Sequence, residues 1–257
     1  MEKFQKFVEN YLRLEYDREC VHISNEAKEI PTVPLPAYKA EIIELMVKSN
    51  VLMIGEFTTK SGRLSPYFVN TGYYKTGRQA DLLANYYAAL INEKLAGKFD
   101  ALFGPAYKGI PLCVLTAAAL WRNHQINTSY CFNRKEVKTH GEGGNIVGHK
   151  PQKGDKLLII EDVISAGTAV REIMPTLEET GATVSDMVIS VNRMEKGQGG
   201  KTAAQEIKED FGITVHSIVT VYDILEYLYN REIDGKIYID NSIKSKMEDY
   251  IRQYCLQ

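Results

Sequence analysis

Short apolar runs alternate with longer stretches of helical periodicity along most of the chain. The apolar runs are VLMIGEF (51–57), FDALFG (99–104), INTSYCF (126–132), KLLIIED (156–162), VSDMVISV (184–191) and ITVHSIVTV (213–221). Helical spacing of apolar residues covers 78–95, 110–123, 169–180, 202–211 and 241–255. Strands that alternate with helices predict an α/β domain, in which helices flank both faces of a central, mainly parallel sheet. In such a sheet, ligands bind beyond the carboxyl ends of the strands.

The first residues follow a pattern of their own. Apolar side chains recur there at helical spacing, and they are Phe4, Phe7, Val8, Tyr11 and Leu12. They predict an amphipathic helix, and the proline-rich joint IPTVPLPA that follows holds the chain extended. We therefore expect a helical extension over 1–37 and a main domain over 38–257. The extension would pack on the domain, contact another copy or bind a partner, and packing is favoured because its apolar face must be buried.

Composition narrows the class of protein. Of the 257 residues, 44% are hydrophobic and 25% charged, which is typical of a globular protein with a sizeable core. A formal net charge of −2 disfavours nucleic-acid binding through bulk charge. The longest apolar run, 110–121, is too short to cross a bilayer, so we expect no membrane partner. The 4 cysteines show no CxxC spacing, and the start of the chain lacks a secretion signal, which together favour a cytoplasmic location.

The segment 157–173 carries the most specific chemistry. Two adjacent carboxylates, Glu161 and Asp162, close an apolar strand and could accept hydrogen bonds from the two hydroxyls of a ribose diol. The small and hydroxyl residues from Ser165 to Thr168 come next, at the start of a helix whose free N–H groups favour a phosphate. The alternative is a plain helix cap with solvated acids, but two acids at the end of an apolar strand are hard to explain that way.

A second loop, FGPAYKG (103–109), again places small residues and a lysine, Lys108, between a strand and a helix. By itself this is an ordinary tight turn. Beside the first loop it suggests a second anion site, as a substrate phosphorylated at both ends would need. By contrast, GGKT at 199–202 is not the end of a P-loop, because the required first glycine would fall at Glu195.

From Asn133 to Gly148 the sequence has no apolar periodicity, and we interpret it as a loop. Its cations Arg134, Lys135 and Lys138, with His140, precede several glycines. Clustered cations on a glycine-hinged loop suit a lid that closes over a departing polyanion and excludes water. The alternative is a solvated surface loop.

These motifs resemble those of a known family. The stretch LLIIEDVISAGTA (157–169) resembles the diphosphoribosyl-binding motif of type I phosphoribosyltransferases. The resemblance implies that family's fold with a small hood, and it implies that the acid pair binds the ribose diol while the following run cups the 5′-phosphate. Glu161 stands where either acid is common and Ser165 where threonine is frequent, and neither departure changes the chemistry. The residues assigned to the substrate in this motif, besides the acid pair, are Val163, Ile164, Ser165, Ala166, Gly167, Thr168 and Ala169.

The resemblance extends to one branch of the family, because 132–148 is close to the loop signature of orotate phosphoribosyltransferases. It implies that this loop contacts the diphosphate and reaches into a neighbouring subunit, so a homodimer with shared active sites is expected. It also implies a cis Ala106–Tyr107 peptide in the pyrophosphate loop. The diphosphate contacts are assigned to Tyr107, Lys108, Arg134, Lys135, Lys138 and His140, and the orotate contacts to Lys60, Phe68, Val69 and Arg193.

Orotate is a flat pyrimidine with a carboxylate, so its pocket needs a cation. Arg193 follows a strand end and is expected to face the same cleft as the acid pair; its alternative role is a surface salt bridge. The family often has a second phenylalanine at Val69, a harmless change if that contact is made by the backbone.

The implied reaction is orotate plus 5-phosphoribosyl 1-diphosphate giving orotidine 5′-phosphate and pyrophosphate, in pyrimidine biosynthesis. Mg²⁺, held mainly by substrate and water, would be the cofactor. The residues expected to act in catalysis are Lys138, His140, Glu161 and Asp162. Two alternatives remain at this stage, namely transfer to another base such as a purine, and a non-catalytic regulator that senses the sugar diphosphate.

Overall fold

The computed structural model describes residues 35–59, 62–138, 144–164, 167–197 and 199–256, without the side chains of 137, 138 and 144. The predicted amino-terminal helix lies outside the described residues, so that helix and the boundary at 37/38 stay predictions. Among the predicted site residues, Lys60, His140, Ser165, Ala166 and the side chain of Lys138 also lie outside them.

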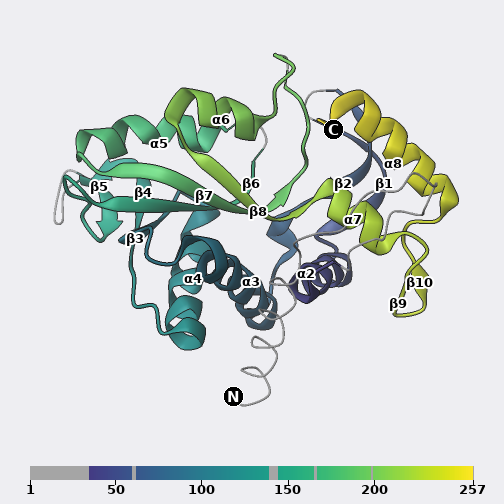
Figure 1. The fold of residues 1–257 in the computed structure, drawn as a ribbon, viewed down its shortest axis with the longest axis horizontal. Helices are drawn as coiled ribbons and strands as arrows, with labels where there is room; N and C mark the ends of the chain where they lie inside the picture. The colour runs from purple at the N-terminus through teal and green to yellow at the C-terminus, as the bar shows by residue number, and fades with distance from the viewer. Residues whose placement is uncertain (1–34, 60–61, 139–143, 165–166, 198, 257) are drawn as a thin grey trace, which may run out of the picture. The chain divides into compact units, whose positions relative to one another are not determined.

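A six-stranded sheet forms the centre of the described domain, with strand order β5-β4-β3-β6-β7-β8 (Figure 1). All neighbouring strands are parallel except β4 and β5, which are antiparallel, so the prediction of a mainly parallel sheet is confirmed. The strands are β3 (Ala101–Gly104), β4 (Ser129–Lys138), β5 (Gly144–Gly148), β6 (Lys156–Val163), β7 (Thr183–Asn192) and β8 (Thr214–Thr220).

Helices cover both faces of this sheet, as predicted (Figure 1). Helices α3 (Gly77–Leu95) and α4 (Gly109–His124) lie on one face, and α5 (Thr168–Glu179) and α6 (Ala203–Phe211) on the other. The Thr202 side chain caps α6 by accepting from the Gln205 backbone N–H, in a capping box. The threonine of the GGKT sequence is therefore a helix cap.

A smaller antiparallel unit accompanies the sheet. Strands β1 (Leu52–Thr58) and β2 (Leu64–Val69) pair as a hairpin, which we call the hood hairpin and which matches the predicted small hood. The helical turn η1 (Thr71–Tyr73) follows β2. The remaining elements are α2 (Ala37–Lys48), α7 (Val221–Leu228), β9 (Glu232–Ile233), β10 (Lys236–Ile237) and α8 (Asn241–Tyr254), the last of which packs against β2.

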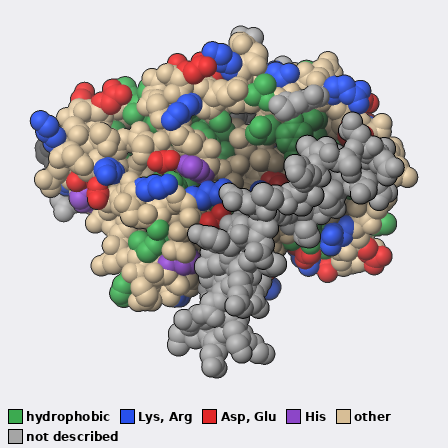
Figure 2. Space-filling model, in the orientation of Figure 1, with side chains coloured by type: hydrophobic (Ala, Val, Ile, Leu, Met, Phe, Trp, Pro, Cys, Tyr) green, Lys and Arg blue, Asp and Glu red, His purple; other side chains and the backbone are tan. Residues whose placement is uncertain are grey.

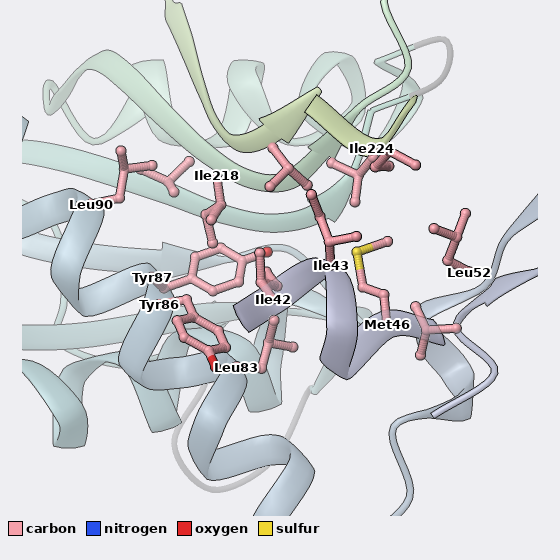
Figure 3. Packing of buried hydrophobic residues seen from close by; sticks show 14 of the residues in the cluster. Ile42, Ile43, Met46, Leu52, Leu83, Tyr86, Tyr87, Leu90, Ile218 and Ile224 are labelled. Carbon is pink, nitrogen blue, oxygen red and sulfur yellow. The ribbon is translucent and has the colours of Figure 1, made fainter. Parts of the chain in front are cut away.

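The largest hydrophobic core joins the hood hairpin to one face of the sheet. Figure 3 shows Ile42, Ile43 and Met46 of α2 directed toward Tyr87 of α3 and Ile224 of α7. All are fully buried, and burial of side chains this large supplies roughly 1.5–3 kcal/mol each before entropy is counted. A second core fills the space between the sheet and α5 and α6. The two cores fix the carboxyl ends of β3, β6 and β7 relative to the hood hairpin.

The structure corrects the prediction that 133–148 is a loop. Most of the segment forms β4 and β5, which pair with Asn133 opposite Ile146 and Lys138 opposite Gly144. Because β5 is an edge strand, its partner β4 can place polar side chains toward solvent, so the segment lacks the apolar pattern that usually indicates a strand.

A second correction concerns 213–221, predicted as one apolar run. The strand ends at Thr220, and α7 begins at Val221, since Thr220 accepts a hydrogen bond from the Asp223 backbone N–H as a helix cap. The apolar residues before and after the cap are buried in both elements, so hydropathy alone does not mark the boundary.

The described surface agrees with the near-neutral net charge of −2. Figure 2 shows acidic and basic side chains interspersed on the face in view. Within the described residues, no helix is both long and apolar enough to span a membrane.

Candidate active site

The acid pair occupies the carboxyl end of β6, where the surrounding elements fix its backbone. The buried Tyr87 hydroxyl donates to the Glu161 carbonyl oxygen at 2.7 Å, and Ser190 Oγ donates to the Asp162 carbonyl oxygen at 2.7 Å. Both carbonyl groups are therefore satisfied from neighbouring elements, α3 and β7, and the carboxylates are held at the sheet edge.

The two carboxyl groups of the pair differ in their electrostatics. Burial raises the pKa of Glu161, and the charge of Asp162 adds to that rise. Burial also acts to raise the pKa of Asp162, but the Thr71 hydrogen bond and the charge of Lys108 outweigh it and hold that pKa below its ordinary value. Asp162 is thus the anion of the pair, and Glu161 holds a proton more readily.

One cation reaches this pair directly. Lys108 Nζ lies 3.1 Å from Asp162 Oδ2 and 3.3 Å from Thr71 Oγ1, while the Lys108 side chain remains 58% exposed. The Thr71 hydroxyl in turn donates to Asp162 Oδ2 at 2.5 Å. Much of the lysine is open to solvent, so its charge is available to a ligand that enters the cleft.

The loop that carries Lys108 depends on two glycines. A Cβ on Gly104 would lie 2.4 Å from the Gly109 carbonyl oxygen, and a Cβ on Gly109 would lie 2.9 Å from the Ile160 carbonyl oxygen. The Asn133 side chain accepts from the Ala106 backbone N–H at 2.8 Å and so holds the loop from β4. The Ala106–Tyr107 peptide is cis, which confirms what the sequence resemblance implied.

Helix α5 begins at Thr168, within the last residues of the motif. Gly167 precedes it with φ of +66°, the left-handed region that glycine adopts without strain. Among the described residues, no side chain caps this helix, and Thr168 is exposed. The free N–H groups of its first turn therefore remain available to an anion.

These parts line one cavity of about 240 Å³. Its lining comes from the 104–109 loop, the end of β6, the start of α5 and one residue of β7, and consists of Ala106, Tyr107, Lys108, Glu161, Asp162, Val163, Ile164, Gly167, Thr168, Ala169, Val170 and Met187. The structure thus brings the acid pair, Lys108 and the amino end of α5 into a common space. Such a space offers carboxylates for hydroxyls and N–H groups for a phosphate.

A neighbouring cavity of about 180 Å³ adjoins the first, because Ala106 and Ala169 line both. Arg134 and Lys135 line the second cavity, and Lys135 Nζ also lies 3.3 Å from Glu172 Oε2. Two of the predicted lid cations therefore lie beside the acid-pair cavity.

The described base-contacting residues of the prediction, Phe68, Val69 and Arg193, line neither of these two cavities. Arg193 lines neither cavity; its Nη2 is 2.6 Å from Glu195 Oε1 and its guanidinium lies 5.0 Å from the centre of the Tyr67 ring. The Glu195 carboxylate and the Tyr67 ring attract the guanidinium toward β2, and the expected contact of Arg193 with the base stays a prediction. Phe68 stacks on Phe57 with ring centres 5.5 Å apart.

Sequence reasoning missed four residues that support the site. Thr71, Tyr87, Asn133 and Ser190 hold the acid pair or the 104–109 loop through side-chain hydrogen bonds. Each partner lies at least 27 positions away in the chain, so no local pattern marks the pairing. Asn133 had an indirect signal, since it opens the segment 133–148 that was interpreted as a lid.

The side chains available as metal ligands determine how this site could hold a metal ion. Among the described residues, no group of three or more His, Cys, Asp or Glu side chains could hold a metal ion. The acid pair supplies two carboxyl groups beside a phosphate-sized space, which suits Mg²⁺ bound largely by substrate oxygens and water.

Comparison with known proteins gives a consistent result. Residues 71–223 match the model of the phosphoribosyl transferase domain. The chain is 51% identical to the orotate phosphoribosyltransferase of Clostridium acetobutylicum, over 84% of this chain and 97% of that protein. It is 48% identical to the orotate phosphoribosyltransferase of Colwellia psychrerythraea, over 78% of this chain and 89% of that protein.

A solved structure supports the same relationship. The crystal structure of orotate phosphoribosyltransferase from Francisella tularensis superimposes with a TM-score of 0.73 at 38% identity, and the match covers 84% of this chain and all of that one. The fold predicted from the sequence is thereby confirmed.

Proposed function

The chain belongs to the orotate phosphoribosyltransferases, and we propose that the acid-pair cavity is where it transfers ribose 5-phosphate from 5-phosphoribosyl 1-diphosphate to orotate. The products are orotidine 5′-phosphate and pyrophosphate, in the pathway that builds UMP. The names of the relatives disfavour the two alternatives, a purine transferase and a non-catalytic regulator.

The sugar diphosphate would bind across the two adjoining cavities. Its 5′-phosphate would accept from the first-turn N–H groups of α5, and its 2′ and 3′ hydroxyls would donate to the acid pair. Its diphosphate would meet Lys108 and, in the neighbouring cavity, Arg134 and Lys135. The assigned contacts of Lys138 and His140 belong to the same proposal.

The charged residues of the cavity are suited to breaking the bond between C1 of the ribose and the pyrophosphate oxygen. Departure of pyrophosphate from C1 leaves positive charge on the sugar and negative charge on the leaving oxygens. The ionised Asp162 beside the diol stabilises the positive charge on the sugar, and the ammonium of Lys108 stabilises the negative charge on the leaving oxygens. Mg²⁺ bound to the diphosphate would neutralise part of the leaving charge. No covalent nucleophile is required, because the orotate nitrogen takes the place of the pyrophosphate oxygen at C1.

Orotate would be bound by the hood. Phe68 and Val69 end β2, and Lys60 lies in the connection between β1 and β2. Within the described chain, the Nε and Nη2 groups of Arg193 are buried without a hydrogen-bond partner, although Nη2 is in ion-pair contact with Glu195. Those two groups lie on one side of a guanidinium, where a carboxylate binds in a bidentate manner. Arg193 would therefore bind the orotate carboxylate after a side-chain rearrangement.

The proposal includes a homodimer in the cytoplasm, with the 133–148 hairpin of each subunit reaching the other's site. Arg134 and Lys135 line a cavity of their own subunit, so the part of the hairpin proposed to reach the other subunit is the end that carries Lys138 and His140. The described cysteines, Cys113, Cys131 and Cys255, are free and buried, which suits a reducing compartment.

One observation carries the proposed function: the acid pair, Lys108 and the start of α5, which no described side chain caps, line a single cavity. The test is to mix the protein with Mg²⁺ and 5-phosphoribosyl 1-diphosphate and compare the consumption of orotate and hypoxanthine by absorbance. We expect only orotate to be consumed, and only when all components are present. Consumption of hypoxanthine alone would assign the chain to a different base, and consumption of neither would overturn the enzyme proposal.

A further inference from the structure

Thr71 forms a closed set of contacts with the two charged groups of the cavity. Its Oγ1 donates to Asp162 Oδ2 at 2.5 Å and accepts from Lys108 Nζ at 3.3 Å, while Lys108 Nζ is 3.1 Å from the same Asp162 oxygen. Only one arrangement of hydrogens satisfies all three contacts, because an ammonium cannot accept and a carboxylate cannot donate. The Thr71 hydroxyl therefore fixes the direction of both charged side chains.

The backbone at Thr71 is itself anchored in the hood. Asn70 accepts from the Gly72 backbone N–H through its side chain, and its own N–H donates to the Val51 carbonyl oxygen at 2.8 Å. Phe68 and Val69, the proposed orotate contacts, immediately precede this anchor in β2. Thr71 is thus the point at which the hood contacts the sugar end of the cavity.

We propose that Thr71 is a positioning residue for the transfer reaction: its hydroxyl orients the Asp162 carboxylate and Lys108 for the sugar diphosphate and links their position to the hood. This inference rests on the proposed function, since it names a further residue of the same site. Thr71 does not line the cavity, so it acts through Asp162 and Lys108.

The ionisable groups around Asp162 determine how loss of the Thr71 hydroxyl would change the pKa of Asp162. Lys108 from the 104–109 loop, Glu161 on the same strand and Tyr87 of α3 are the ionisable groups that interact with it. The Thr71 hydrogen bond is one of the contacts that hold the pKa of Asp162 low against burial. Removing the hydroxyl should raise that pKa, so Asp162 would lose its charge at a higher pH than in the unaltered protein.

The test compares Thr71→Val, which removes the hydroxyl at nearly constant shape, with Thr71→Ser, which keeps it. We expect Thr71→Val to raise KM for 5-phosphoribosyl 1-diphosphate by about tenfold, the usual effect of losing a hydrogen bond to a charged group. Thr71→Ser should stay within about twofold of the unaltered protein by the same measure. The acid limb of the pH profile of kcat/KM for the diphosphate should move to higher pH in Thr71→Val only.

Thr183→Val is the matched control, because Thr183 begins β7, at the end of the strand away from the acid pair, where its Oγ1 donates to the Asp155 carbonyl oxygen. It should leave KM and the pH profile unchanged. Equal behaviour of Thr71→Val and the unaltered protein would overturn the proposal, as would equal impairment of Thr71→Val and Thr71→Ser.

A binding titration of the three proteins with 5-phosphoribosyl 1-diphosphate and Mg²⁺ separates this inference from the proposed function. If the unaltered protein binds the diphosphate but consumes no orotate, the proposed function fails, and weaker binding by Thr71→Val alone still supports the role of Thr71. If binding is equal in all three proteins, the role of Thr71 fails whatever the activity.

Discussion

At the residue scale, Asp162 carries most of the electrostatic asymmetry of the site. It keeps its charge through Thr71 and Lys108, while its neighbour Glu161, 9% exposed, is pushed toward the protonated form. A pair in this state presents one anion to the sugar and avoids the repulsion of two adjacent buried charges.

Asp162→Asn should therefore impair use of the sugar diphosphate specifically. The amide keeps the shape and can still accept from Thr71, but it loses the charge that attracts Lys108 and the developing positive sugar. We expect KM for the diphosphate to rise and kcat to fall, for a combined loss in kcat/KM of roughly 10- to 100-fold. Steady-state kinetics with each substrate varied would measure it.

Asp155→Asn is the control for Asp162→Asn, because Asp155 forms an ion pair with His149 just before β6 starts, away from the cavity. A normal rate and KM in Asp162→Asn would remove Asp162 from the proposed site.

Gly104→Ala tests the glycines that shape the Lys108 loop. The added Cβ would lie 2.4 Å from the Gly109 carbonyl oxygen, a backbone atom, and 2.7 Å from Cβ of the buried Cys113. We expect a loss of about 1–3 kcal/mol in the free energy of unfolding and a large loss of activity, because the loop must shift. Urea unfolding monitored by circular dichroism would measure the free energy of unfolding.

Gly77→Ala provides the baseline, since no atom lies within 4 Å of its added Cβ and the residue begins α3. Its stability should be unchanged or slightly raised. Equal stability of the two variants would show that the loop tolerates a side chain at position 104.

The acid pair and the Lys108 loop could be predicted from the sequence because their residue types are unusual for strand ends. Thr71 and Asn133 could not, because their role arises from contacts 91 and 27 positions away. Arg193 was expected at the acid-pair cavity from its place after a strand end, but the direction of a long side chain depends on the local charges, here Glu195.

At the element scale, α8 connects the carboxyl end of the described chain to the hood. Tyr250 donates to Glu195 Oε1 at 2.7 Å, and its ring meets that of Tyr67 edge-on at 6.0 Å. Glu195 in turn contacts Arg193. The sequence predicted α8 as a helix but gave it no role, since its partners lie in β2 and after β7.

Tyr250→Phe should loosen this connection. The half-buried Glu195 carboxylate would lose a donor, so we expect the free energy of unfolding to fall by about 1–2 kcal/mol. KM for orotate should change more than KM for the diphosphate, because Glu195 holds Arg193 and does not touch the acid pair. Thermal unfolding and the two KM values would measure the effect.

Tyr130→Phe is a suitable control, since Tyr130 is 40% exposed on β4, away from the hood. If Tyr250→Phe changed both KM values equally, the link between α8 and base binding would be wrong.

The hairpin of β4 and β5 is the element that the apolar pattern of the sequence did not predict. The six apolar runs all contain strands of the structure, whereas β5 and the outer half of β4 have few apolar residues because they lie at the sheet edge. Their charged residues were correctly noticed as unusual. The chemistry of those residues was visible in the sequence, but the backbone pairing that presents them was not.

At the scale of the whole molecule, the main open proposal is a homodimer whose sites are shared. Beyond Phe132, β4 pairs with the edge strand β5 and no longer with β3; Lys138 lies at the end of β4, and the segment that joins β4 to β5 carries His140. If Lys138 and His140 serve the neighbouring subunit, then a substitution in the 133–148 hairpin and one in the acid pair damage different parts of each composite site.

Mixing two inactive variants tests this directly. Lys138→Ala should lower turnover far more than orotate binding, and Asp162→Asn should impair diphosphate use. If sites are shared, each hybrid dimer of the two variants has one doubly altered site and one intact site, so exchange of subunits should restore about a quarter of the unaltered activity. If each subunit supplied its own lid, every site would carry one substitution and mixing would restore nothing. Subunit exchange verified by mass measurement makes that second outcome decisive against sharing, because hybrids would then be present and inactive.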